Sequence, residues 1–153
     1  MRLHMSSEKI KGAIYERGYV YNFHIHLIWC TKYRNPVFNT PELVQDMKEL
    51  LLYIAKLNDI TVETLEVMPD HVHMLISFKP KKAPTDVVKA LKGGSARMFL
   101  EKYPEIRKKY YWGSAHLWTR SYYMSTLGNM SRDVVENYIN NQTLHQHVWV
   151  NIA

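Results

Sequence analysis

The sequence predicts a single α+β domain of the ferredoxin-like type (βαββαβ): an antiparallel sheet with helices on one face, followed by a C-terminal helix. Runs rich in aromatic and β-branched residues alternate with segments of helical periodicity in the order that this fold requires. A tight turn is expected to join the two middle strands into a hairpin. The chain has 153 residues, 46% of them hydrophobic, which suits one domain with a buried core.

The first strand and the first helix carry clear local signals. Residues 19–31, YVYNFHIHLIWCT, are predicted to form a strand because aromatic and β-branched residues dominate them. Thr40 is the expected N-cap of the following helix, and Pro41 is its expected first residue. Hydrophobic residues then recur at helical spacing as far as Leu57, which predicts an amphipathic helix.

A hairpin is predicted from two strand-like runs separated by turn residues. ITVETLEVM (residues 60–68) and HVHMLISF (residues 71–78) have the composition of strands. Pro69-Asp70 lies between them and favours a tight turn. The two runs are therefore expected to pair as neighbours in the sheet.

The second half of the chain predicts helix, strand and helix. Thr85 is the expected N-cap of a helix over residues 86–102, in which Gly93-Gly94 marks either a break or a close approach of another segment. A short basic stretch leads to the expected fourth strand, HLWTRSYYMSTL (residues 116–127). Ser131 is the expected N-cap of the last helix.

Positive charge is concentrated in one segment of the chain. Net charge is +6, but the stretch from Lys79 to Arg120 holds 11 Lys and Arg against three acidic residues, and it also contains Tyr and Trp. Cations beside aromatic rings favour a nucleic-acid strand, because phosphates take the charge and unpaired bases stack. A solvated helix face with core aromatics is the alternative. The candidate DNA-binding residues are Lys79, Lys81, Lys82, Lys89, Lys92, Arg97 and Arg120.

Composition also indicates the compartment. No apolar run approaches the ~20 residues that span a bilayer. The first residues, MRLHMSSEKIKGAIYERG, lack the apolar core of a signal peptide. Cys30 is the single cysteine, which suits a reducing cytoplasm. We therefore expect a soluble cytoplasmic domain that does not contact membranes.

Paired histidines are the first chemical signal. The chain has three His-x-His pairs: His24 and His26, His71 and His73, and His145 and His147. Alternate residues of a strand share a face, so His71 and His73 can converge on one metal ion while Val72 points into the core. Two partly exposed histidines that bond to their neighbours are the alternative. The first pair has the same geometry, and periodicity cannot choose between these two pairs.

The last helix carries a second signal in NYINNQ. Tyr138 and Gln142 are four residues apart, so they share one face of a helix. A glutamine oxygen can join two imidazoles around a divalent ion, and a phenol can act as a nucleophile toward phosphorus. Alternatively, Tyr138 belongs to an apolar stripe with Val134, Val135 and Ile139.

Four separated segments resemble the HUH-type single-tyrosine transposases of small bacterial and archaeal insertion sequences. They are YNFHIHLIWCTKYRNPVF, MPDHVHMLISF, ALKGGSARMF and LWTRSYYMSTLGNMSRDVVENYINNQ, and together they run from about residue 19 to residue 142. The resemblance implies that His71, His73 and Gln142 bind Mg²⁺ or Mn²⁺ and that Tyr138 is the catalytic nucleophile. It also implies an N-terminal extension (1–18), a transposase domain (19–143) and a C-terminal tail (144–153).

The resemblance further implies the reaction and the partners. Such enzymes act as homodimers on single-stranded DNA beside hairpins at the ends of a mobile element, and they cleave through a 5′-phosphotyrosine before rejoining strands. The tyrosine helix can serve its own subunit or its partner. Two alternatives stay open: a domesticated HUH nickase of genomic repeat hairpins, and a non-enzymatic ferredoxin-like module that binds single-stranded nucleic acid.

Overall fold

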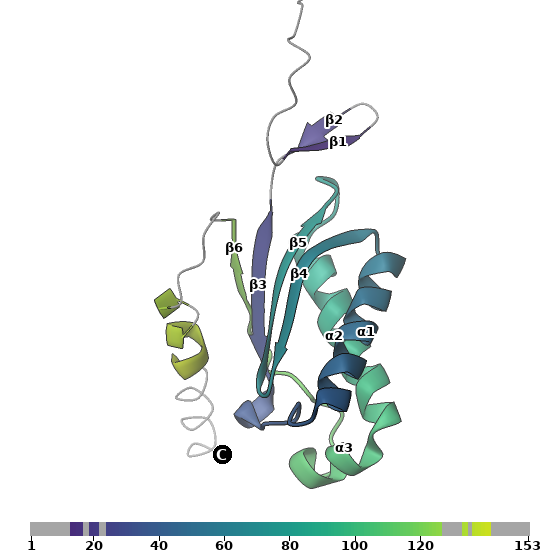
Figure 1. Ribbon diagram of the computed structural model, residues 1–153, viewed down its shortest axis with the longest axis vertical. Coiled ribbons are helices and arrows are strands. Elements are labelled where there is room, and N and C mark those ends of the chain that lie inside the picture. The colour runs from purple at the N-terminus through teal and green to yellow at the C-terminus, as the bar shows by residue number, and fades with distance from the viewer. Residues whose placement is uncertain (1–12, 17–18, 22–23, 127–132, 135, 142–153) are drawn as a thin grey trace, which may run out of the picture.

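The computed structural model describes residues 13–16, 19–21, 24–126, 133–134 and 136–141 (Figure 1). The elements in chain order are β1 (Ile14–Glu16), β2 (Tyr19–Tyr21), β3 (Ile25–Cys30), the 3-10 turn η1 (Lys32–Arg34), α1 (Pro41–Leu57), β4 (Ile60–Met68), β5 (His71–Phe78), α2 (Pro84–Lys102), α3 (Pro104–Tyr111) and β6 (Tyr123–Ser125). Residues 133–134 and 136–141 are also helical, as predicted for the last helix, whereas the expected N-cap Ser131 lies outside the described residues.

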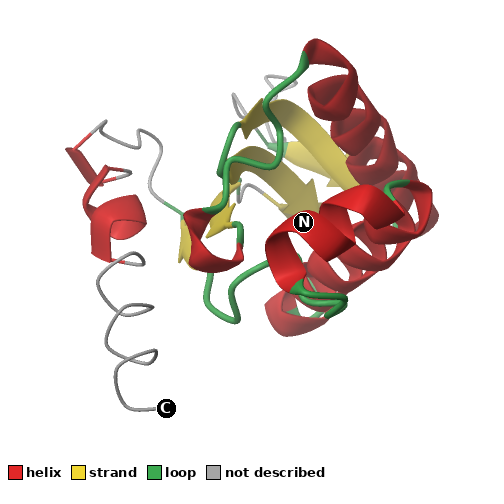
Figure 2. Ribbon diagram, turned by 90° about the horizontal axis from the view of Figure 1, so that it is seen from below, coloured by secondary structure: helices red, strands yellow, loops and turns green. Residues whose placement is uncertain are grey.

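Four strands form one antiparallel sheet in the order β4-β5-β3-β6. Helices α1 and α2 pack against one face of this sheet, and the helical residues 133–134 and 136–141 lie on its β6 side, away from α1 and α2 (Figures 1 and 2). This arrangement confirms the ferredoxin-like α+β fold. The hairpin β4–β5 is confirmed with its turn at Pro69-Asp70.

The strand register determines which side chains face the helices. Ile25 pairs with Ile76, Leu27 with Met74 and Trp29 with Val72, and all six are buried in the core beneath α1 and α2. Directly paired residues of antiparallel strands share a face. The intervening pairs therefore belong to the opposite face, called the open face here because α1 and α2 do not cover it; they are His26 with Leu75, Ile28 with His73, and Cys30 with His71. Ile28 and Cys30 are nevertheless buried on this face.

The first predicted strand is wrong in extent, because residues 19–31 form two separate strands. β2 pairs with β1 in a two-stranded hairpin, and β3 begins only at Ile25. The register explains this boundary. Ile25 pairs with Ile76, and β5 ends two residues later at Phe78, so β3 has little partner strand beyond that point.

Helix α1 has the predicted cap, whereas the predicted cap of α2 is wrong. The Thr40 hydroxyl accepts a hydrogen bond from the Leu43 amide at 3.2 Å. Helix α2 begins at Pro84, one residue before Thr85, because proline lacks an amide proton and suits the first helical position. Gly93-Gly94 does not break α2; instead a Cβ at Gly94 would lie 3.0 Å from Ile54 Cδ1 on α1. Of the two interpretations, close approach is confirmed for Gly94.

The segment between α2 and β6 differs most from the sequence prediction. Helix α3 was not predicted, although Pro104 at its start and Lys108 and Lys109 in its last turn are ordinary helix signals. The fourth strand is only Tyr123–Ser125, with an isolated bridge from Trp118 to Thr31. No helix in the described part of the chain is long and apolar enough to cross a membrane.

Candidate active site

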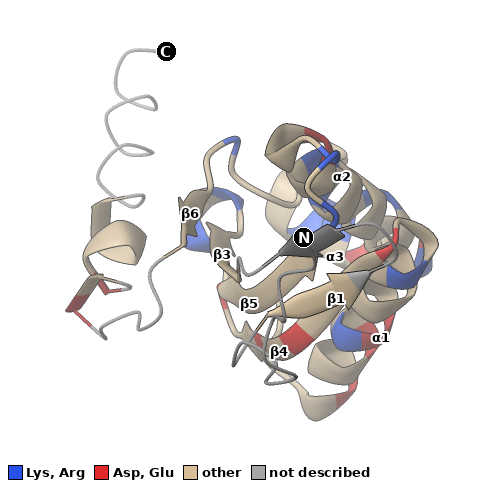
Figure 3. Cartoon of the chain, turned by 90° about the horizontal axis from the view of Figure 1, so that it is seen from above, with Lys and Arg blue, Asp and Glu red and all other residues tan. Residues whose placement is uncertain are grey.

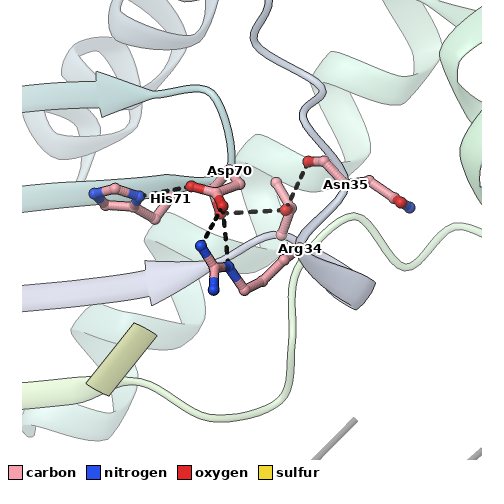
Figure 4. Close-up of polar contacts among 5 residues, drawn as sticks. Arg34, Asn35, Asp70 and His71 are labelled. Carbon is pink, nitrogen blue, oxygen red and sulfur yellow. Dashed lines mark hydrogen bonds and ion pairs between the residues drawn. The ribbon is translucent and has the colours of Figure 1, made fainter. Parts of the chain in front are cut away.

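His71 is held in one orientation by a carboxylate at the start of β5. Its Nδ1 donates to Asp70 Oδ1 at 2.8 Å, and the Arg34 guanidinium donates through Nε and a terminal nitrogen to Asp70 Oδ2 at 3.0 Å (Figure 4). The pKa of the Asp70 carboxyl is lowered chiefly by the His71 hydrogen bond and also by Arg34, although burial opposes this. Because Nδ1 carries the donated proton, Nε2 of His71 keeps its lone pair for another partner.

The Pro69-Asp70 turn is tied to the segment after β3 by several hydrogen bonds. The Thr31 amide donates to Asp70 O at 2.9 Å, and the Thr31 hydroxyl lies 3.2 Å from the same oxygen and 2.8 Å from Asn35 O. The Phe38 amide donates to Pro69 O at 3.1 Å. These bonds fix Asp70, and hence His71, relative to the sheet.

His73 shares the open face with a histidine from the first pair. His26 Nδ1 lies 3.2 Å from His73 Nε2, so one imidazole donates to the other. Burial lowers the pKa of His73, and the His26 and His71 imidazoles lower it further, whereas Glu66 acts in the opposite direction. The structure therefore favours a neutral His73, the form that can bind a metal. His24 contacts Glu63 instead.

The residues present fit a metal ion only in part. His71 and His73 offer imidazole nitrogens from one face of one strand, as predicted. His26 Nε2 is buried without a hydrogen-bond partner in the described part of the chain. Among these described residues, no group of three or more His, Cys, Asp or Glu is arranged to hold an ion. The predicted third ligand, the amide of Gln142, lies outside the described residues.

Tyr138 lies beside the same face of the sheet. Its hydroxyl is 3.2 Å from Ser121 Oγ, and its ring centroid is 5.7 Å from that of Tyr123. Tyr123 pairs with Ile28, which pairs in turn with His73, so these three residues form one row across β6, β3 and β5. Neighbouring strands are ~4.8 Å apart, which places Tyr123 and His73 about 10 Å apart at the backbone.

The hydroxyl of Tyr138 is a phenol rather than a phenolate at neutral pH. Burial raises the pKa of Tyr138 to about 12, although the hydrogen bond to Ser121 acts in the opposite direction. A phenol is a poor nucleophile until a base or a cation removes or polarises its proton. Nucleophilic chemistry at this residue therefore requires a partner that favours the phenolate.

The predicted DNA-binding residues are only partly brought together (Figure 3). Lys92, Arg97 and Arg120 line a hollow of about 470 Å³ between α2 and residues 115–120, together with Arg107. Lys81, Lys82 and Lys89 do not line it, and Lys79 forms an ion pair with Asp59 at 3.1 Å.

Lys92 has a structural role as well. Its amine donates to Thr119 O at 2.6 Å and Ser121 O at 3.0 Å, and burial lowers its pKa to about 8. Because these carbonyls bond to Lys92, residues 119–121 do not extend β6. The same bonds position Ser121 beside the Tyr138 hydroxyl. The contact of Lys92 with DNA stays a prediction.

Sequence reasoning missed the roles of Asp70 and Arg34, whereas the central position expected for the first strand had already placed His24 or His26 near the paired histidines. Asp70 was visible as the acidic residue directly before the histidine pair, but it was assigned only to the turn. Arg34 is 36 residues from Asp70, and His26 is 47 residues from His73, so only the fold brings them together. No local signal in the sequence identifies such partners.

The sequence of this chain is similar to those of known transposases. Residues 19–142 match the family described as "Transposase IS200 like". The chain is 46% identical over 126 residues to the ISDra2 transposase TnpA of Deinococcus radiodurans, covering 82% of this chain and 88% of that protein. It is 27% identical over 122 residues to the transposase of insertion sequence element IS200 from Salmonella typhimurium, covering 80% of this chain and 78% of the relative.

Two solved structures are similar in fold. A crystal structure of a candidate transposase from Deinococcus radiodurans R1 superposes with a TM-score of 0.76 at 42% identity, covering 84% of this chain and 97% of that one. The structure of a REP-associated tyrosine transposase bound to a REP hairpin has a TM-score of 0.50 at 12% identity, covering 84% and 67%. The second likeness concerns the fold alone.

The four-stranded antiparallel sheet with its helices has the fold of a tyrosine transposase. The chain belongs to the IS200-like transposase family, and it is a transposase.

Proposed function

We propose that this transposase cleaves and rejoins single-stranded DNA beside hairpins at the ends of its element, with Tyr138 as the nucleophile. The observation that supports the proposal is the contact of Tyr138 with Tyr123, whose row across the sheet leads through Ile28 to His73 on the same face. The family match to IS200-like transposases supports it. The neighbour bound to a REP hairpin, although similar in fold alone, is consistent with a hairpin substrate.

The chemical step balances at Tyr138. The phenol oxygen attacks the scissile phosphorus, the bond between phosphorus and the 3′ oxygen breaks, and a 5′-phosphotyrosine forms. The phenolic proton leaves, and the departing 3′ oxygen gains a proton to become a hydroxyl. That hydroxyl can later attack a phosphotyrosine, which reseals a strand without an added energy source. A tyrosine ester conserves the energy of the phosphodiester bond, so this route needs no nucleotide cofactor.

His71 and His73, with Gln142, would hold a divalent cation at this site. A bound Mg²⁺ or Mn²⁺ polarises a phosphate oxygen and favours an ionised nucleophile. Asp70 keeps the Nε2 lone pair of His71 available, and burial keeps His73 neutral. Imidazole ligands suit Mn²⁺ better than Mg²⁺, so Mn²⁺ is expected to support cleavage well.

A homodimer fits the proposed reaction, because element ends come in pairs and two sites can process both. The arrangement described here places Tyr138 beside the sheet of its own chain, through Ser121 and Tyr123. If the helix that carries Tyr138 completed the site of the partner subunit instead, Tyr138 would have to break its contacts with Ser121 and Tyr123.

The hollow lined by Lys92, Arg97 and Arg120 is the part of the predicted basic surface that best suits a DNA backbone.

A metal-dependent covalent adduct tests the proposed function. The protein is mixed with labelled single-stranded DNA from the ends of its element, with Mn²⁺ or with EDTA, and run on a denaturing gel. We expect a band of DNA attached to protein with Mn²⁺ and none with EDTA, because the phenol needs activation. Tight binding without an adduct under any divalent ion would overturn the proposal in favour of a binding module.

Asp70→Asn is expected to weaken cation binding through His71. Asparagine keeps the size of the side chain but loses the charge that holds the imidazole in its tautomer and pairs with Arg34. Loss of such a carboxylate costs metal affinity about 10- to 100-fold. Mn²⁺ affinity, measured by electron paramagnetic resonance of the free ion, should fall by this factor. Cleavage should recover in part at high Mn²⁺.

Asp59→Asn, at an exposed ion pair with Lys79, is the matched control. Unchanged Mn²⁺ affinity in Asp70→Asn would show that His71 is positioned without Asp70.

A further inference from the structure

A pair of exposed aromatic rings stands next to the candidate active site. The Trp112 side chain is 84% exposed and Tyr33 is 40% exposed. Their ring centroids are 6.2 Å apart with an interplanar angle of 69°, an edge-to-face contact between η1 and the end of α3. One large indole face is therefore open to solvent.

The backbone conformation at this pair is unusual for residues with side chains. Tyr33, Arg34 and Trp112 have φ values of 60°, 51° and 48°, in the left-handed region that favours glycine. Trp112 is the C-cap of α3, and the chain places tryptophan there although a glycine, Gly113, follows directly. Strained residues of this kind cluster at functional sites, where the surrounding structure holds them in place. Folding alone does not require aromatic side chains at these positions.

The two segments that carry the rings are rich in basic residues. Lys32 Nζ lies 5.3 Å from the centroid of the Tyr33 ring. Lys108 and Lys109 occupy the last turn of α3, and the Arg107 side chain bonds to Gly113 O at 2.7 Å. Residues 32–34 and 104–113 together contain five basic residues and one acidic residue, Glu105. The patch therefore combines an open aromatic face with cations, which suits a polyanion whose flat groups are unpaired.

The same backbone segment connects the rings to the paired histidines. Tyr33 precedes Arg34, whose guanidinium holds Asp70 and through it His71 (Figure 4). Asn35 Nδ2 donates to Tyr110 O at 3.4 Å, which ties η1 to α3. The Lys32 amide donates to Leu117 O at 2.8 Å. The segment that carries Tyr33 is therefore the one that positions His71.

We propose that Tyr33 and Trp112 form a stacking platform for unpaired bases of the DNA strand that leads to the cleavage site. The inference deepens the proposed function and takes its substrate class from it. The Trp112 face accepts one base, and Lys32, Lys108 and Lys109 neutralise the flanking phosphates. The platform selects single-stranded over duplex DNA, because a paired base has no free face. It reads no sequence, since every base can stack.

The test measures binding separately from cleavage. Fluorescein-labelled oligothymidine, long enough to fill a site of about 4–16 nucleotides, is titrated in EDTA and followed by anisotropy. A duplex of the same length is the second probe. Trp112→Ala should raise the Kd for the single strand by roughly 5- to 150-fold, the factor that one base–aromatic stack contributes, and leave the duplex Kd unchanged. Trp112→Phe should retain most of the affinity, because a ring remains.

Two further variants keep the inference open to refutation. Tyr33→Ala removes the other ring and is expected to weaken single-strand binding as well. Tyr53→Ala, at an aromatic residue on α1 that is 53% exposed, is the matched control and should bind normally. Circular dichroism melts establish that each variant is folded. Unchanged single-strand affinity in folded Trp112→Ala, or an equal loss in Tyr53→Ala, would overturn the platform.

The outcomes also separate the platform from the proposed function. If the wild type forms the Tyr138 adduct and Trp112→Ala binds the single strand normally, the platform is refuted and the proposed cleavage stands. A wild-type protein that forms no adduct, with binding still lost in Trp112→Ala, would refute cleavage and keep the platform. Retained binding by a variant with neither ring would show that a different surface, such as the hollow beside α2, holds the strand.

Discussion

Tyr138→Phe is expected to form no covalent adduct with DNA while binding it as tightly as the wild type. Phenylalanine keeps the ring that packs against Tyr123 and loses only the oxygen that bonds to Ser121. The helix should therefore stay in place, and the affinity measured in EDTA should not change. Adduct formation, followed on a denaturing gel with Mn²⁺, should fall below detection, because the nucleophile itself is absent.

Tyr123→Phe is the matched control for this substitution. Tyr123 lies against the same ring and on the same face of the sheet, but its hydroxyl has no part in the proposed chemistry. Adduct yield in Tyr123→Phe should stay near the wild-type value. An adduct that persists in Tyr138→Phe would assign the nucleophile to another tyrosine, with Tyr122 and Tyr123 the first to replace.

The structure adds a chemical requirement to this prediction. Burial raises the pKa of Tyr138 to about 12, so the side chain is a neutral phenol at pH 7. The Ser121 hydroxyl lowers this pKa but does not bring it near neutrality. The helix therefore presents a protected phenol in the absence of DNA and cation, which limits unproductive attack. In the proposed reaction, activation comes with the substrate and the cation.

Local signals were enough to predict the sheet hairpin, helix α1 and the shared face of His71 and His73, whereas metal binding by this pair stays a prediction. Proline-aspartate between two strand-like runs specifies the β4–β5 turn, and a period of two places His71 and His73 on one face with Val72 in the core. Thr40 caps α1 as predicted, because capping depends on residues only three positions apart. Each of these features depends on residues that are close together in the sequence.

Features that depend on distant contacts could not be predicted. β6 is shorter than expected because Lys92, on α2, binds the carbonyls of Thr119 and Ser121. β3 is shorter because its partner β5 ends at Phe78. The Arg34–Asp70–His71 chain joins segments 36 residues apart in the sequence. Lys, Arg and Asp side chains occur in many proteins without such contacts, and only the folded chain brings Lys92, Arg34 and Asp70 to their partners.

His71→Ala is expected to abolish metal-dependent cleavage while the protein stays folded and binds DNA. The side chain lies on the open face of the sheet, 17% exposed, and Arg34 continues to neutralise Asp70 after its removal, so no buried charge is left without a partner. The fold should tolerate the loss, because Val72 and Met74 hold β5 in the core from the opposite face.

Two readouts distinguish a ligand from a structural histidine in this experiment. Mn²⁺ affinity should fall together with adduct yield in His71→Ala and in His73→Ala, whereas thermal stability and DNA affinity in EDTA should change little. His116→Ala, at an exposed histidine that lines the hollow beside α2, is the matched control and should retain Mn²⁺ binding. Normal cleavage by His71→Ala would transfer the metal site to His73 and His26, whose nitrogens lie 3.2 Å apart and are therefore close enough to bind one ion. In that case His26→Ala, rather than His71→Ala, should lose both Mn²⁺ binding and the adduct.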